Sequence, residues 1–217
     1  MSPKRLAVFD LDGTITRHDT LVRYVLGYLL RRPWRLPRAL LVVPAAAAFS
    51  LRLIGRGRLK STLLRATLGG VPRAEIECWT AEFVPRVLEN GTFAGAREAI
   101  ARHLREGDHL VLMSATVDLY VPAIARALGF HEAICTGVRW RGDRLDGHLS
   151  TPNRRGEEKA RCLRELRERH PGEATAYGNA ASDLAHLKLV EHGVLVNGSA
   201  AARREAARRG IACAVWR

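Results

Sequence analysis

The sequence has few cysteines, and none of them stands at a metal-binding spacing. Its four cysteines are scattered, with no C-x-x-C pair in 217 residues. This argues against a zinc site or a disulfide framework and suits a reducing compartment. The N-terminal stretch MSPKRLAVFDLDGT also lacks an apolar run long enough for a signal peptide. We therefore expect the protein to be cytoplasmic.

Acidic residues are also scarce relative to basic ones. The chain has 35 Lys and Arg residues against 22 Asp and Glu residues, a formal net charge of +13. Such an excess suits nucleic acids, anionic membrane surfaces or anionic small substrates, and it also arises from an Arg-rich composition alone. Aromatic residues interleaved with the basic ones are missing, as is any nucleic-acid-binding motif. We therefore expect no nucleic-acid partner.

Strand-like apolar runs alternate with helical segments along most of the chain. This alternation predicts an α/β fold with a parallel sheet covered by helices on both faces. The strand-like runs are RLAVF (5–9), HLVLM (109–113), EAIC (132–135), EATAY (173–177), GVLVN (193–197) and IACAV (211–215). The helical segments are 93–105, 117–128, 155–169 and 181–191, and WRGDRL (140–145) is typical of a hairpin.

Residues 20–90 break this alternation, because no strand-like run occurs there and the apolar residues follow helical spacing. Several prolines punctuate the segment. We interpret it as a helical insertion in the α/β core. The expected division is a core made of residues 1–18 and 91–217, with a helical cap at 19–90.

No apolar run reaches the roughly 20 residues needed to span a bilayer. The longest candidate, ALLVVPAAAAFSL (39–51), has no charged residue. Two interpretations stay open: a helix buried within the cap, or an interfacial contact with a membrane. Trp34 and basic residues on both sides favour the second. The basic residues are Arg31, Arg32, Arg35 and Arg38 before the segment, and Arg52, Arg56, Arg58 and Lys60 after it.

The strongest chemical signal is the loop DLDGT (10–14), which directly follows the first predicted strand. Ligands of an open parallel sheet bind outside the carboxyl ends of its strands. Asp10 and Asp12, two positions apart in such a loop, can present one carboxylate to a metal and the other to a reacting group. A solvated loop with two acids is the alternative interpretation.

Two weaker signals occupy similar positions. Ser114 and Ala115 follow the second predicted strand, where a hydroxyl beside backbone N–H groups at a helix start can bind an anion. Ser and Thr are also common helix caps. Lys159 lies in the helix predicted at 155–169, where it could face a phosphate or be an ordinary surface lysine.

The loop YGNAASD (177–183) follows the strand predicted at 173–177. It places the amide of Asn179 and the carboxylate of Asp183 four positions apart among small residues. Small residues let a backbone approach a ligand closely. The loop is therefore expected beside DLDGT at the carboxyl edge of the sheet.

The order of these motifs, D-x-D-G-T, Ser, Lys and N-x-x-x-D, resembles the haloacid dehalogenase-like (HAD) phosphatase superfamily. The helical cap and the segment LDGHLSTPNRRGEEK (145–159) resemble its phosphoserine-phosphatase-like branch, and the resemblance covers essentially the whole chain. It implies a Rossmann-like core with an inserted helical cap. It also implies Mg²⁺-dependent hydrolysis of a phosphomonoester through an aspartyl-phosphate.

The resemblance further implies a role for each candidate residue. Asp10 would attack phosphorus, and Asp12 would protonate the leaving alkoxide and later activate water. The groups holding the phosphoryl oxygens would be Ser114, Ala115 and Lys159. The metal ligands would be Asp10, the Asp12 backbone carbonyl and the loop with Asn179 and Asp183.

One position departs from the family pattern, in which an Asp commonly stands where this chain has Asn179. An amide oxygen can bind Mg²⁺ but brings no charge, so the resemblance implies a lower metal affinity. Asp183 would bind the ion through water or brace Lys159.

Three interpretations of the function stay open. The opening DLDGTITRHD, the basic and apolar cap, and the GEEK motif resemble bacterial phosphatidylglycerophosphatase C, which implies a lipid phosphate at the inner face of the membrane. The alternative is a soluble phosphatase for phosphoserine or histidinol phosphate, in which Asp19 would hold the substrate amine rather than cap a helix. Residues 20–70 contain no acid, which favours the lipid. The third is a non-catalytic binding protein with the same fold.

Overall fold

A six-stranded parallel sheet forms the core of the computed structural model, which describes residues 5–217. The strand order is β3-β2-β1-β6-β7-β8, so β1 lies between two partners and is fully buried. The strands are β1 (Leu6–Phe9), β2 (His109–Val117), β3 (Glu132–Thr136), β6 (Ala174–Gly178), β7 (His192–Val196) and β8 (Ala212–Ala214). The predicted parallel α/β sheet is confirmed. The start of the N-terminal stretch and of the predicted core, residues 1–4, lies outside the described residues.

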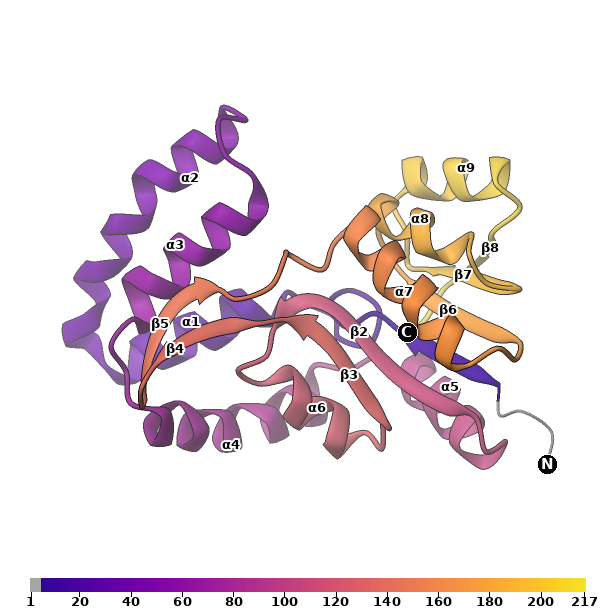
Figure 1. Cartoon of the computed structure of the whole chain (residues 1–217), viewed down its shortest axis with the longest axis horizontal. Coiled ribbons are helices and arrows are strands. Elements are labelled where there is room, and N and C mark those ends of the chain that lie inside the picture. The colour runs from indigo at the N-terminus through magenta and orange to yellow at the C-terminus, as the bar shows by residue number, and fades with distance from the viewer. Residues whose placement is uncertain (1–4) are drawn as a thin grey trace.

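Helices cover both faces of the sheet (Figure 1). Alternate residues of β1 face opposite sides: Ala7 and Phe9 pack in one hydrophobic cluster, and Leu6 and Val8 in the other. The first cluster contains α5 (Ala94–Arg105) and α6 (Val121–Ala127). The second contains α7 (Glu157–Arg169), α8 (Leu184–Leu187) and α9 (Ala200–Arg208).

Two predicted elements differ from the structure, and one helix was not predicted. Strand β2 continues to Val117, so the helix predicted at 117–128 begins only at Val121. The helix predicted at 181–191 is a 3₁₀ turn, η2 (Ala181–Asp183), followed by the single turn of α8. Helix α9 was not predicted, although Ala and Arg favour helix and Ser199 caps its first turn.

The cap is helical, as predicted, and stands to one side of the sheet (Figure 1). Tyr24, Trp79 and Phe83 of the cap form an aromatic cluster with Tyr120, which precedes α6. The Tyr24 and Tyr120 rings stack with centroids 4.5 Å apart. This cluster ties the cap to the core. The cap elements are α1 (Thr20–Arg31), the 3₁₀ segment η1 (Pro33–Val42), α2 (Val43–Ser50), α3 (Arg56–Leu68) and α4 (Arg73–Asn90).

The predicted hairpin is confirmed as β4 (Val138–Arg141) and β5 (Arg144–Leu149). It hydrogen-bonds to the cap: Leu145 N–H donates to Val71 O at 2.9 Å, and Gly70 N–H donates to Leu145 O at 2.8 Å. The hairpin, assigned to the core on sequence, therefore packs on the cap. The domain boundaries at 18–19 and 90–91 stay a prediction.

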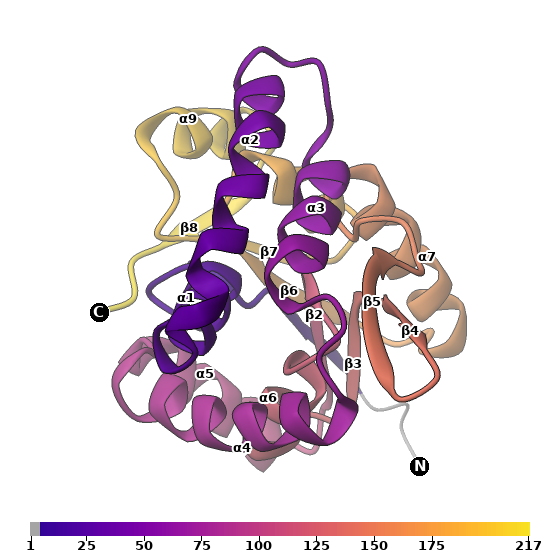
Figure 2. The same ribbon diagram turned by 90° about the vertical axis from the view of Figure 1, so that its left-hand side faces the viewer.

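Residues 33–53, which we call the arm, project from the cap at the end farthest from the sheet (Figures 1 and 2). No residue of η1 or α2 is buried, so the interpretation of 39–51 as a helix buried within the cap is wrong. Elements η1 and α2 pack on α3 along one side only, so the side chains on their other side lie in solvent. The large exposed ones are Trp34, Leu36, Leu40, Leu41, Val43, Leu51 and Leu53. Within residues 5–217 no helix is long and apolar enough to span a membrane.

Candidate active site

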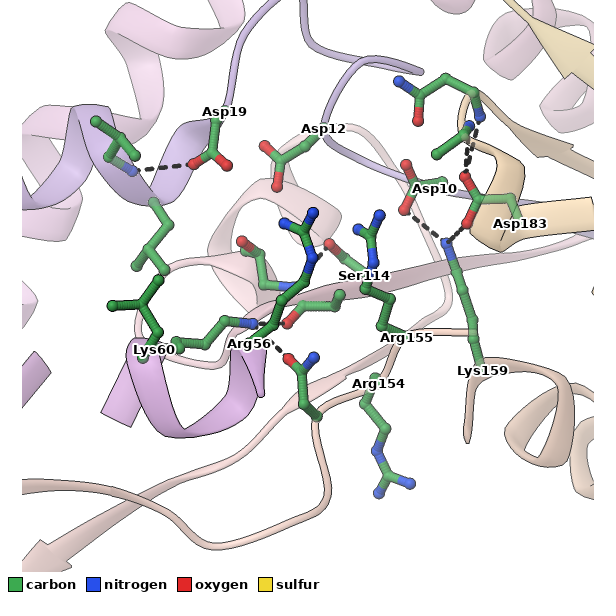
Figure 3. Close-up of a pocket in the computed structure, with 18 of the residues that line it drawn as sticks. Asp10, Asp12, Asp19, Arg56, Lys60, Ser114, Arg154, Arg155, Lys159 and Asp183 are labelled. Atoms are coloured by element: carbon green, nitrogen blue, oxygen red, sulfur yellow. Dashed lines mark hydrogen bonds and ion pairs between the residues drawn. The ribbon is translucent and has the colours of Figure 1, made fainter. Parts of the chain in front are cut away.

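All eight candidate residues named from the sequence line one pocket of about 240 Å³ between the sheet and the cap (Figure 3). Parallel strands β1, β2 and β6 bring their carboxyl ends to this edge. The residues are Asp10, Asp12, Asp19, Ser114, Ala115, Lys159, Asn179 and Asp183. The structure therefore brings them together, while their roles stay a prediction.

Asp10 is a buried carboxylate held from both sides. Its Oδ1 accepts a hydrogen bond from Lys159 Nζ at 2.6 Å, and its Oδ2 accepts one from Thr14 Oγ1 at 3.2 Å. Burial raises the pKa of Asp10 to about 6, although the Lys159 ammonium acts in the opposite direction. The group therefore stays largely ionised at neutral pH, as a carboxylate nucleophile requires.

Asp12 is bound to the first residue of the cap. Its Oδ1 accepts hydrogen bonds from the backbone N–H of Thr20 at 2.8 Å and from Thr20 Oγ1 at 2.7 Å. Burial raises the pKa of Asp12, with these hydrogen bonds acting against the rise. A raised pKa suits a carboxyl group that passes a proton to a leaving oxygen.

Ser114 lies inside β2, not at a helix start as predicted, because the strand continues past it. The pairing of β2 with β3 shifts register between Met113 and Val117, so residues 114–116 leave the regular ladder. Ser114 Oγ accepts a hydrogen bond from Thr116 N–H at 3.1 Å and keeps its own proton for donation. The irregular stretch with Ala115 forms the floor of the pocket.

Lys159 is buried, with 1% of its surface exposed, so its interpretation as a surface lysine is wrong. Its Nζ lies 2.6 Å from Asp10 Oδ1 and 3.3 Å from Asp183 Oδ1. Burial alone would lower the pKa of Lys159, but the two carboxylates raise it above the ordinary value. A permanent positive charge therefore lies beside the Asp10 carboxylate.

Asp183 braces the loop that carries it. Its Oδ2 accepts hydrogen bonds from the N–H groups of Asn179 at 3.1 Å and Ala180 at 2.9 Å. Against the effect of burial, Lys159 and these bonds lower the pKa of Asp183 to about 2. Both oxygens are therefore engaged within the protein, which fits a bracing role better than direct metal ligation.

Asn179 lies directly against the DLDGT loop. Gly13 has φ of +82°, and a Cβ there would lie 2.0 Å from Asn179 Nδ2, so glycine is required on both counts. This packing brings the Asn179 amide to the loop of Asp10 and Asp12. Their carboxylate, carbonyl and amide oxygens are hard donors that fit Mg²⁺, with less negative charge than a second carboxylate would supply.

Asp19 caps helix α1, because its Oδ1 accepts a hydrogen bond from Val22 N–H at 3.0 Å. The helix-cap interpretation is therefore confirmed. The side chain also lines the pocket, where Figure 3 shows it opposite Asp12. A role toward a substrate amine stays a prediction.

Three cations that line the same pocket, Arg56, Lys60 and Arg155, were not placed there from the sequence, which named Arg56 and Lys60 only as basic residues beside the segment 39–51. Arg154 lines the pocket as well and pairs with Glu158. Lys60 Nζ donates to Asn153 Oδ1 at 2.6 Å and to Ala115 O, and burial lowers the pKa of Lys60 to about 8. Within the part of the chain that the structure describes, none of the three pairs with a carboxylate. The acid-free stretch 20–70 signalled a cationic cap, but not which side chains point inward.

Comparisons with known proteins agree with this arrangement. A family model described as haloacid dehalogenase-like hydrolase matches residues 7–188. Protein CicA of Caulobacter vibrioides is 31% identical over 196 residues, covering 86% of this chain and 83% of that protein. Phosphoserine phosphatase SerB1 of Mycobacterium tuberculosis is 28% identical over 213 residues, covering 94% of this chain and 68% of that protein.

A solved structure of a protein of unknown function from Bordetella pertussis Tohama I has the same fold. Its TM-score is 0.81 at 24% identity, and the match covers 98% of both chains. The resemblance to phosphatidylglycerophosphatase C is not tested by these relatives and stays a prediction.

Replacing Asp183 by Asn should destabilise the protein at neutral pH. The pKa of Asp183 is lowered from its ordinary 3.8 to about 2, which corresponds to about 2 kcal/mol of unfolding free energy. This contribution is complete above pH 4 and is lost as the pH falls through about 2. Denaturant unfolding should therefore give a lower free energy of unfolding for Asp183→Asn than for the wild type at pH 7. The difference between the two proteins should become smaller at pH 2.5. Asp19→Asn, which preserves a helix cap, should change stability little; a pH-independent gap for Asp183→Asn would contradict the assignment.

Proposed function

The chain belongs to the haloacid dehalogenase-like hydrolases and is a phosphatase of that family, and we propose that it cleaves phosphomonoesters through an aspartyl-phosphate on Asp10. One observation carries the proposal. The Asp10 carboxylate is buried against the Lys159 ammonium, in a pocket that Asp12 of the same loop also lines. A buried, ionised carboxylate beside a fixed cation suits attack on a phosphate that is itself anionic.

The reaction balances with the groups in the pocket. An Asp10 oxygen forms a bond to phosphorus as the bond to the ester oxygen breaks, and Asp12 gives its proton to the leaving alkoxide. Asp12, now a carboxylate, takes a proton from water, which attacks phosphorus and releases phosphate from Asp10. Lys159 and Ser114 bind the phosphoryl oxygens throughout.

Mg²⁺ fits the donor set, and we assign it to Asp10, the Asp12 backbone carbonyl and Asn179, with Asp183 bracing the loop behind them. When bound, the ion would neutralise charge on the phosphoryl oxygens. Because Asn179 contributes no charge, we propose that the ion binds weakly to the free protein.

Asp10→Asn should lower the rate of Mg²⁺-dependent hydrolysis of an aryl phosphate by about 10³-fold or more, because the amide cannot act as nucleophile. Asp143→Asn, in the exposed turn between β4 and β5, is the matched control and should keep the wild-type rate. Equal rates for wild type and Asp10→Asn would leave the non-catalytic interpretation standing.

We further propose that the substrate is a phosphorylated membrane lipid. Val22, Leu26 and Leu30 form an exposed stripe at four-residue spacing along α1, and Val22 also lines the pocket. The exposed apolar side chains of the arm lie beyond this stripe. An apolar surface of this kind suits acyl chains better than water.

Five of the eight basic residues around the arm divide into two groups. Arg31 pairs with Glu82 at 2.9 Å, and Arg32 pairs with Glu75, so both stabilise the cap. Arg38, Arg52 and Arg58 are exposed and form no ion pair among residues 5–217. These three suit anionic headgroups at the cytoplasmic face of a membrane.

The soluble alternative, a phosphatase for phosphoserine or histidinol phosphate, has less support. One oxygen of Asp19 already accepts the helix-capping bond, and the other pocket-lining side chains from the cap are cationic or apolar. Arg56, Lys60 and Arg155 favour a substrate with a second anionic group near the ester. Phosphatidylglycerophosphate has such a group, a phosphodiester, and phosphoserine has a carboxylate.

Removing apolar surface from the arm should abolish membrane binding. The combined change Leu40→Ser, Leu41→Ser, Leu51→Ser and Leu53→Ser should reduce co-sedimentation with phosphatidylglycerol vesicles at least about tenfold, while aryl phosphate hydrolysis stays unchanged. Val215→Ser, an exposed apolar residue elsewhere, should have no effect. If the wild-type protein co-sediments with neither anionic nor neutral vesicles, this result would contradict the lipid proposal and favour a small substrate.

Lys60→Met should change the KM only for substrates that have a second anionic group. We expect the KM for phosphatidylglycerophosphate in mixed micelles to rise about tenfold, with no change for an aryl phosphate that has no second anion. Because the pKa of Lys60 is about 8, the wild-type KM for the first substrate should also rise above pH 8, as the ammonium loses its proton. In Lys60→Arg this alkaline rise should be absent. An equal rise in KM for both substrates would contradict the proposed contact between Lys60 and the second anionic group.

A further inference from the structure

His186 in α8 is completely buried, and the proposed chemistry does not use it. Among residues 5–217, neither of its ring nitrogens has a hydrogen-bond partner. A buried polar group without a partner destabilises a protein, because it loses its bonds to water and gains none. A leucine of similar size would fill the same space without this loss, so the imidazole calls for another explanation.

The other fully enclosed histidine of the core shows the ordinary arrangement. His103 Nδ1 lies 2.6 Å from Asp108 Oδ2, and its Nε2 lies 2.9 Å from Tyr177 OH. Both nitrogens of His103 are therefore satisfied. The nitrogens of His186, in contrast, have no hydrogen-bond partner, and its ring lies next to Asp183 of the active site.

His186 lies close to Asp183, the residue that braces the active-site loop. His186 Nδ1 lies 3.9 Å from Asp183 Oδ1, just beyond hydrogen-bond distance. The same oxygen accepts a long 3.3 Å bond from Lys159, whose shorter bond goes to Asp10. Asp183 Oδ1 is therefore contacted by Lys159 on one side and approached by His186 on the other.

We propose that His186 is a positioning residue that donates a hydrogen bond from Nδ1 to Asp183 Oδ1 when Lys159 binds the substrate phosphate. The inference rests on the proposed function, in which the Lys159 ammonium contacts a phosphoryl oxygen. As Lys159 turns toward that oxygen, its longer and weaker bond to Asp183 is the one that breaks. The imidazole then closes a gap of about 1 Å and keeps the carboxylate satisfied.

The replacement bond keeps the loop in place during the reaction. Asp183 Oδ2 fixes the backbone of Asn179 and Ala180, and Asn179 packs against Gly13 of the nucleophile loop. A carboxylate left without a partner at Oδ1 would rotate and loosen these contacts. The Nδ1 of His186 therefore lacks a hydrogen-bond partner in the free protein and gains one in the phosphate complex.

The test compares His186→Leu with His186→Gln, which retains an N–H donor. His186→Leu should raise the Tm of the free protein, because it removes two buried unpaired nitrogens. It should also weaken binding of inorganic phosphate, measured by calorimetry with Mg²⁺ present, by about tenfold, the expected effect of losing one hydrogen bond to a charged group. His186→Gln should restore part of the phosphate affinity.

His103→Leu is the matched control and should lower the Tm, because Asp108 and Tyr177 lose their partner. If His186→Leu leaves phosphate affinity and kcat unchanged, or lowers the Tm, the inference is overturned. A wild-type protein that hydrolyses no phosphomonoester would instead overturn the proposed function. The two failures are distinguishable, because the Tm comparison requires no activity.

Discussion

The buried ion cluster of Lys159 with Asp10 and Asp183 is the interaction on which the rest of the site depends. Three charged side chains lie in a region closed to solvent, where an isolated charge would be strongly unfavourable. They persist because each oxygen and the ammonium have partners: Thr14, two backbone N–H groups and one another. The cluster joins α7 to the loops after β1 and β6, so folding of the sheet and assembly of the site are one event.

Apart from Asp19, the charged side chains that the cap brings to the pocket are cations, whereas the core brings three acids and the ammonium of Lys159. Thr20, the first residue of α1, holds Asp12, while Lys60 reaches from α3 to the carbonyl of Ala115 on β2. The site therefore exists only where cap and core meet. In the proposed function, a substrate phosphate would lie between these two layers.

The positions of Asp10 and Asp12 could be predicted from the sequence, because acidic residues that directly follow a buried parallel strand lie at the carboxyl edge of the sheet. Lys159 could not be assigned to the site from its own segment, because a lysine in a helix is usually exposed. Only the order of the motifs along the chain indicated that its side chain faces the pocket. The extent of β2 was missed because the small residues after Met113 are typical of a loop. The sequence did not determine whether 39–51 is buried or exposed, because an apolar helix has the same residue pattern whether or not another part of the protein packs over it.

The hairpin of β4 and β5 determines how the cap can move. Because its backbone is bonded to residues 70–73, any opening of the cap carries the hairpin with it. The moving body is then connected to the sheet by four chain segments instead of the two expected for a simple insertion. Four short connections restrict rotation of the cap more than two would.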